Sequence, residues 1–280
     1  MLSENSRLFG REFFYFCNDM LTKNTIKYIK SLSEKKFRNA YGSFIAEGPK
    51  IVSDIAGSSL KIEKLFATQT WLDQNETLLE KPDEIHCITT KELSAISLLT
   101  TPNQVLATIK IPSPVFQAVM AAQSLIITLD DIRDPGNLGT IIRIADWFGF
   151  KNILCSETSV DAFNPKCVQS TMGSIARVNI YYENLMDVFK NCPDNTNIYG
   201  AFLHGENIYD INPEPHGFLI IGNEANGIQP EVAKLVTRHI SIPAGSHAGL
   251  HAESLNASAA TAILCSEFFR KTNHVTKTST

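Results

Sequence analysis

No stretch of this 280-residue sequence is apolar for long enough to cross a membrane as a helix, which would take about 20 residues. The first twenty residues also lack an apolar core stretch and a small-residue cleavage site, so they make a poor signal peptide. A segment of clearer helical character begins at Met20. We therefore expect a cytoplasmic protein and interpret residues 1–22 as an extension outside the folded domains.

Paired cysteines and a dominant charge are missing as well. The six cysteines include no CxxC pair, and the chain is far too long to need a disulfide framework, which indicates a reducing compartment. The 25 basic and 29 acidic residues leave a net charge of −4. Because the whole protein has no strong positive field, a polyanionic partner would have to bind a local patch.

Short apolar runs alternate with helical patterns along the chain, and 44% hydrophobic residues are enough to fill substantial cores. In the first half we expect an amphipathic helix over 24–39, strands at 44–48, 64–69, 85–89 and 105–110, and helices near 49–57, 71–79 and 91–99. The second half contains six more strand patterns: SLIITLD, NILC, ARVNIYY, NIYGAFL, GFLIIGN and HISIP. This alternation predicts an α/β fold with a mostly parallel sheet covered on both faces. The expected domains are 23–110 and 124–272, joined by a proline-containing linker at 111–123 and followed by a tail at 273–280.

The common nucleotide-binding fingerprints are absent. DIRDPGNLGTIIRIADWFGF, residues 131–150, leads from a strand through a loop into a helix, whose free NH groups favour nucleotide-like ligands. GNLG is not GxGxxG, however, and no GK[ST] is present to hold a triphosphate. Asn137 and Arg143 are the candidate functional residues. The alternative is that Asn137 caps the helix and Arg143 forms a surface ion pair.

A second polar loop is FLIIGNEANGI, residues 218–228. It places Glu224 at the end of a strongly apolar strand, between Gly222 and Gly227. In open α/β sheets, ligands bind at the carboxyl ends of the strands. The alternative is an ordinary glycine turn with a solvated glutamate.

The third stretch, residues 240–270, joins a strand through a Gly/Ala-rich loop to a helix that begins with small residues. Small side chains permit close approach of a ligand or of another chain segment, although Ser254 alone is typical of a helix N-cap. His247 and His251 stand beside Glu253. Because they lie on a glycine-rich loop without a third ligand at a recognised spacing, we do not expect a metal site.

Taken together and in this order, the three stretches resemble the three motifs of the SpoU/TrmH family of RNA ribose 2′-O-methyltransferases. The matching segments are DPGNLGTIIRIADWFG, IIGNEANGI and IP…ESLNASAATAILCSE, and the resemblance covers about residues 125–270. FIAEGPKIVSD fits the opening of the L30e-like RNA-binding domain that precedes the catalytic domain in many members. The resemblance implies a trefoil-knotted (SPOUT) catalytic domain that binds S-adenosylmethionine and pairs into a homodimer.

The resemblance also assigns site residues. It implies that the catalytic residues are Asn137, Arg143, Glu224, Ser254 and Asn256. The residues implied to hold the cofactor are Leu203, Gly205, Gly222, Asn223, Gly227, Ile242 and Leu255. Arg143 would orient the ribose hydroxyl and stabilise its developing negative charge, and the other catalytic residues would position Arg143 and the nucleotide by hydrogen bonds. Methyl transfer of this kind needs no metal.

Residues 23–50 form the local basic patch that the overall charge calls for. The expected RNA-binding residues are Lys23, Lys27, Lys35, Lys36 and Arg38, interleaved with aromatic side chains. Lysines contact phosphates, and an exposed aromatic ring stacks on an unpaired base. The alternative is a solvated helix face whose aromatic rings belong to the core.

The sequence therefore favours a 2′-O-methyltransferase that acts on ribosomal RNA, specifically 23S RNA of the large subunit. A transfer RNA substrate is the second hypothesis, and a non-catalytic RNA-binding assembly factor is the third. A dinucleotide-dependent oxidoreductase is disfavoured by the missing glycine fingerprint.

Overall fold

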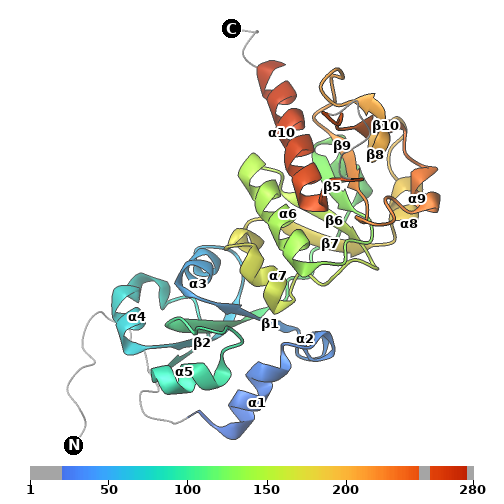
Figure 1. Ribbon diagram of the computed structural model, residues 1–280. Coiled ribbons are helices and arrows are strands. Elements are labelled where there is room, and N and C mark those ends of the chain that lie inside the picture. Colours follow the sequence, from blue (N-terminus) through green and yellow to red (C-terminus); the bar gives the residue numbers. More distant parts are fainter. Residues whose placement is uncertain (1–20, 246–252, 276–280) are drawn as a thin grey trace, which may run out of the picture. The chain divides into compact units, whose positions relative to one another are not determined.

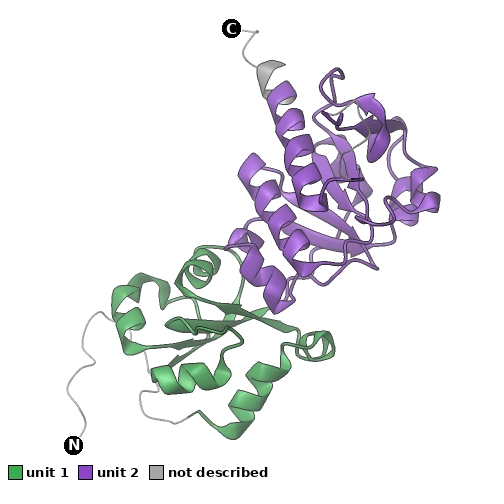
Figure 2. Cartoon of the chain, in the orientation of Figure 1, with its two compact units in different colours: residues 1–110 green, residues 111–280 purple. Residues whose placement is uncertain are grey.

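The computed structural model describes residues 21–245 and 253–275, so the expected N-terminal extension and most of the tail lie outside the described residues. The chain divides into two compact units, residues 1–110 and 111–280 (Figure 2). Among the described residues, no helix is both long and apolar enough to cross a membrane.

Unit 1 is a small α/β unit built on a mixed sheet of four strands, in the order β1-β4-β2-β3. The strands are β1 (Ser43–Glu47), β2 (Ile62–Ala67), β3 (Glu84–Cys87) and β4 (Val105–Lys110). The helices are α1 (Lys23–Ser31), α2 (Lys35–Tyr41), α3 (Pro49–Ala56), α4 (Gln69–Gln74) and α5 (Thr90–Ile96). Apolar side chains of α1 and α5 pack on one face of the sheet, and α3 lies on the other (Figure 1).

The helix expected over 24–39 is two helices. Leu32 ends α1, and Glu34 has an extended backbone before α2 begins at Lys35. The buried guanidinium of Arg38 donates through Nη1 to the carbonyl oxygens of Leu32 and Ser33, both at 2.9 Å, and so stabilises the turn. An apolar pattern continues across this break because both helices bury residues in unit 1. Periodicity alone therefore does not reveal the turn.

Unit 2 contains a sheet of six parallel strands, in the order β10-β8-β9-β5-β6-β7 (Figure 1). The strands are β5 (Leu125–Leu129), β6 (Asn152–Ser156), β7 (Asn179–Glu183), β8 (Ile198–Asn207), β9 (Gly217–Ile221) and β10 (Arg238–Ser241). The helices are α6 (Pro135–Phe148), α7 (Pro165–Ser170), α8 (Leu185–Lys190), α9 (Pro230–Ala233) and α10 (Ala257–Val275). The predicted parallel α/β sheet is confirmed.

The segment expected to be a linker, residues 111–123, falls within unit 2. Ala121 is fully buried in the core of this unit, and Phe116 and Met120 pack against the same core. Proline spacing identified the start of the segment correctly as irregular, but its second half, a 3₁₀ turn at Ala118–Ala122, is held by apolar burial.

Glycine in the GNLG stretch serves helix packing. A Cβ atom on Gly139 would lie 2.6 Å from the carbonyl oxygen of Cys167 and 2.5 Å from Cβ of Ser170, both on α7. Only glycine lets α6 approach α7 this closely. This glycine therefore has a packing role that does not depend on a nucleotide-binding fingerprint.

Asp130 fixes the loop that follows β9 to the end of β5. Its fully buried carboxylate accepts hydrogen bonds from the Gln229 backbone NH at 2.7 Å and from Gln229 Nε2 at 2.8 Å. Burial raises the pKa of Asp130, and the bonds from Gln229 lower it by less. The folded protein thus binds a proton at Asp130 more tightly than the unfolded chain does.

This shift predicts a pH dependence of stability. The stabilising contribution of protonated Asp130 is fully present below the ordinary aspartate pKa of about 4 and is lost as pH rises through the raised value. Asp130→Asn removes the titrating group, so the wild type should lose free energy of unfolding relative to this variant as pH rises. Urea unfolding of the full chain at a series of pH values measures the difference. Asp194→Asn, which removes an exposed carboxylate of the same unit, is the control, and parallel curves for wild type and Asp130→Asn would contradict the prediction.

Candidate active site

The three polar stretches meet at the carboxyl edge of the parallel sheet in unit 2. The first follows β5, the second follows the adjacent strand β9, and the third leads into α10. Carboxyl ends of neighbouring parallel strands lie at the same edge, so loops far apart in sequence come together there. Asn223 joins the first two directly, because its Nδ2 donates to the carbonyl oxygen of Asp131 at 2.8 Å.

Glu224 is the centre of the contact. Its Oε1 accepts hydrogen bonds from Asn137 Nδ2 at 2.8 Å, from Asn256 Nδ2 at 2.5 Å and from the backbone NH of Ala257 at 3.1 Å. Asn256 Nδ2 also lies 3.1 Å from Asn137 Oδ1. One carboxylate oxygen therefore joins the start of α6, the loop after β9 and the start of α10. The other oxygen, Oε2, accepts no hydrogen bond from the described residues.

Helix capping explains why these amides are available. Asp134, not Asn137, caps α6 and accepts the backbone NH of Asn137 at 2.8 Å, so capping was the wrong role for Asn137. Asn256, not Ser254, caps α10, since its Oδ1 accepts the backbone NH of Ser258 at 3.0 Å. The same side chain thus caps a helix with its oxygen and holds Glu224 with its nitrogen.

The loop after β9 needs glycine at both ends. A Cβ atom on Gly222 would lie 2.3 Å from the backbone of Gly227 and Ile228, and Gly227 has a φ of +67°. Asn223 and Gly227 exchange backbone hydrogen bonds of 3.0 and 2.8 Å across the turn. The loop is a closed turn that carries Glu224, and Asp130 anchors its far end through Gln229. Sequence reasoning missed Asp130, although a carboxylate directly after the apolar run SLIITL was a usable signal.

Arg143 is not part of this network. Its side chain is exposed, and it has no hydrogen-bond or ion-pair partner among the described residues. Six residues separate it from Asn137, which is about one and two-thirds helical turns, so the two side chains leave α6 on different sides. The expectation that Asn137, Glu224, Ser254 and Asn256 position Arg143 by hydrogen bonds is therefore wrong for the described part of the chain.

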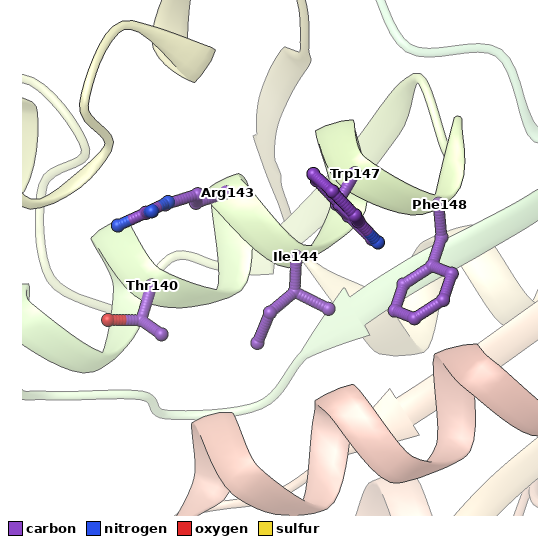
Figure 3. Close-up of a pocket in the computed structure, with 5 residues that line it drawn as sticks. All are labelled: Thr140, Arg143, Ile144, Trp147 and Phe148. Carbon is purple, nitrogen blue, oxygen red and sulfur yellow. The ribbon is translucent and has the colours of Figure 1, made fainter.

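Arg143 instead borders a hollow of about 270 Å³ on α6, together with Thr140, Ile144, Trp147 and Phe148. Figure 3 shows Ile144 and Phe148 pointing toward α10, with Arg143 and Trp147 farther from α10 along the same hollow. Phe148 packs against Phe269 of α10 with ring centroids 5.7 Å apart, and Trp147 is 84% exposed. The guanidinium thus lies beside an uncovered apolar face.

The residues expected to hold a cofactor lie at the same sheet edge. Leu203 and Gly205 belong to the end of β8, Ile242 follows β10, and Leu255 precedes α10. The pairing of β8 with β10 shifts after His239, from Gly200 to Glu206, so the residues between them leave the regular ladder. Leu203 is 69% and Leu255 is 48% exposed. Ser254 is exposed and makes no hydrogen bond with the described residues.

The basic residues expected to bind RNA lie on α1 and α2 of unit 1. Lys23, Lys27, Lys35 and Lys36 are exposed, but Arg38 is only 1% exposed. The expectation that Arg38 binds RNA is corrected, because a guanidinium that is buried against backbone carbonyls cannot contact a phosphate. Its neighbours in sequence gave no sign of this, since a basic residue on a short helix is usually solvated.

No metal cluster occurs within residues 21–245 and 253–275, where no three His, Cys, Asp or Glu side chains are grouped to hold an ion. His247 and His251 lie outside the described residues, and Glu253 is exposed.

Comparison with known proteins identifies the family. Residues 124–266 match the SpoU rRNA Methylase family, and residues 23–107 match the MRM3-like substrate binding domain. A Bacillus subtilis 23S rRNA (guanosine(2553)-2′-O)-methyltransferase is 29% identical over 244 residues, which are 85% of this chain and 93% of the relative.

Solved structures agree. A TrmH-family protein from Porphyromonas gingivalis is 36% identical with a TM-score of 0.77, over 90% of this chain and 100% of its own. An AdoMet-bound rRNA methyltransferase from Sinorhizobium meliloti is 28% identical with a TM-score of 0.77, over 89% of this chain and 95% of its own. The expected SPOUT fold class is thus confirmed, and the trefoil knot stays a prediction, because the loop of the third motif includes residues outside the described part of the chain. The chain belongs to the SpoU rRNA Methylase family.

Proposed function

We propose that the protein uses S-adenosylmethionine to methylate a ribose 2′-hydroxyl of ribosomal RNA, in the 23S RNA of the large subunit. The observation that carries this proposal is the Glu224 network, which draws the three family motifs to one point. The Bacillus relative and the AdoMet-bound neighbour support the substrate class and the cofactor. The match of unit 1 to a substrate-binding domain favours ribosomal over transfer RNA.

The chain's residues fit S-adenosylmethionine at the carboxyl edge of the sheet. Leu203 and Leu255 are exposed apolar side chains that would gain burial against an adenosine. Gly205 and Gly222 pack so closely on neighbouring backbone that a Cβ atom would clash, and Gly227, Asn223 and Ile242 complete the expected set. When bound, the cofactor supplies an electrophilic methyl group, and these residues hold its adenosine and methionine portions.

The catalytic residues act on the ribose side. Glu224 Oε1 is held by Asn137, Asn256 and the Ala257 NH. Those bonds orient the free Oε2 to accept a hydrogen bond from a substrate hydroxyl. Arg143 donates hydrogen bonds to the adjacent phosphate and stabilises negative charge that develops on the 2′-oxygen. A guanidinium keeps its proton in proteins, so Arg143 serves as a donor. Ser254, exposed at the start of the third motif, contacts the nucleotide.

The test is methyl transfer to ribosomal RNA from cells that lack this gene, followed by mapping of the modified ribose. Arg143→Ala should lower the transfer rate by about 10²-fold or more, since it removes a donor that acts in the transition state, while S-adenosylmethionine affinity stays unchanged. Lys190→Ala, at an exposed lysine of α8, is the matched control. An unchanged rate in Arg143→Ala would contradict its role. Methylation of transfer RNA instead would establish the second hypothesis, and a wild type that binds no cofactor would favour a non-catalytic assembly factor.

We further infer that the protein acts as a homodimer that pairs through α6 and α10. Trp147 is 84% and Phe269 is 44% exposed, on two helices that pack together. Large aromatic side chains are enriched at protein interfaces because covering them releases water from a large apolar area. Pairing on this face would place Arg143 at the interface and restrict the conformations of its side chain. The cytoplasmic location stays a prediction.

The dimer has a direct test. Trp147→Glu places a charge in the middle of the proposed interface, so this variant should elute as a monomer where the wild type elutes as a dimer, by light scattering after size exclusion. Val115→Glu adds the same charge at an exposed apolar residue outside both helices and should stay dimeric. A monomeric wild type, or a dimeric Trp147→Glu, would refute pairing on this face.

A further inference from the structure

One aromatic side chain of unit 1 stands out from its core. Tyr41, the last residue of α2, is 52% exposed, and no other large apolar side chain within residues 21–110 is classed as exposed. Its hydroxyl makes no hydrogen bond with the described residues. Neither apolar burial nor a polar contact explains an exposed ring here.

The ring is held in place by two others. Tyr28 of α1 meets Tyr41 edge to face, with centroids 5.0 Å apart, and Phe37 stacks beside it at 6.4 Å. Tyr28 itself packs on the core of unit 1. We call Tyr28, Phe37 and Tyr41 the aromatic platform. Tyr28 anchors the platform to the core of unit 1, and the ring of Tyr41 is open to solvent.

Arg38 explains why the platform is fixed. Its buried guanidinium bonds the carbonyl oxygens of Leu32 and Ser33 at the end of α1, which locks α2 against α1. Tyr28 and Tyr41 lie on these two different helices, so their contact depends on that turn. Arg38 cannot contact a phosphate. It is instead a positioning residue for the exposed ring of Tyr41.

Uncompensated positive charge lies on the same two helices as the platform. Residues 23–41 contain five lysines but one acidic residue, Glu34. Lys23, Lys27 and Lys30 share a face of α1 at spacings of four and three, and with Lys35 they have no ion-pair partner among the described residues. Lys36 pairs with Glu34 at 2.9 Å and lies 4.7 Å from the centroid of the Phe37 ring. Elsewhere in the unit, Lys50, Lys61 and Lys64 each have an acidic partner.

We propose that the aromatic platform binds an unpaired RNA base on Tyr41, while the lysines of α1 and α2 hold the phosphates that flank it. Every base has a π-face, but within a duplex that face is covered by its neighbours, so an exposed ring selects single-stranded or looped-out nucleotides. The row of unpartnered lysines favours a polyanion over a protein partner. This inference rests on the proposed RNA substrate and specifies its form. It follows that the RNA segment that contacts unit 1 is unpaired.

The experiment uses the full chain and two probes, a short single-stranded RNA with one 2-aminopurine and the same sequence annealed into a duplex. Tyr41→Ala should weaken binding of the single strand by roughly tenfold and abolish the quenching of 2-aminopurine that stacking causes. Tyr41→Phe keeps the ring and should behave as the wild type. Lys27→Ala should instead weaken both probes alike and lower the slope of log affinity against log salt by about one.

Wild-type affinity and quenching in Tyr41→Ala would overturn the proposal, as would an equal loss on single strand and duplex. The same loss in Tyr41→Phe would also overturn it, because the stacking ring is retained there. Cofactor affinity, measured in parallel, should be the same in all variants. A wild type that binds no S-adenosylmethionine yet quenches the single strand would refute the proposed methyl transfer and leave the platform standing.

Discussion

The candidate site depends on a single carboxylate oxygen with three donors. Glu224 Oε1 is the only atom that the starts of α6 and α10 and the loop after β9 all share in the network described above. Without it, the amides of Asn137 and Asn256 and the Ala257 NH would each lose the acceptor through which they are joined. The glycines that shape the β9 loop and the buried Asp130 that anchors it serve to hold this oxygen in position.

Under the proposed function, unit 1 recognises the RNA and unit 2 carries out the chemistry. Unit 2 gathers its polar groups at one sheet edge, where the parallel strands β5, β8, β9 and β10 end. Unit 1 presents its charge on two short helices and uses little of it for internal ion pairs. A chain with a net charge of −4 exerts no general attraction on RNA, so under the proposed function the affinity comes from this small surface. Discrimination among RNAs can then change in unit 1 without disturbing the site in unit 2.

Much of the fold followed from the sequence, because each strand of unit 2 is a short apolar run that fits a buried parallel sheet. The convergence of Asn137, Glu224 and Asn256 was predicted from motif resemblance, and the geometry of parallel strands explains it. The break after Leu32 and the burial of Arg38 depend on how a helix packs against another segment. The separation of Arg143 from Asn137 follows instead from their six-residue spacing along α6. A hydrophobic pattern indicates that a residue is buried, but it does not indicate which segment buries it.

The buried side chains that fix a turn in each unit, Arg38 in unit 1 and Asp130 in unit 2, differ in whether their charge changes with pH. The turn beneath Tyr41 is fixed by a guanidinium, which stays charged at any pH a folded protein tolerates. The turn beneath Glu224 is fixed by a carboxylate, which can gain a proton. Acidification would therefore add a proton to the carboxylate that anchors the loop in unit 2, while the guanidinium that fixes the turn in unit 1 keeps its charge, so the two units differ in how their stability depends on pH.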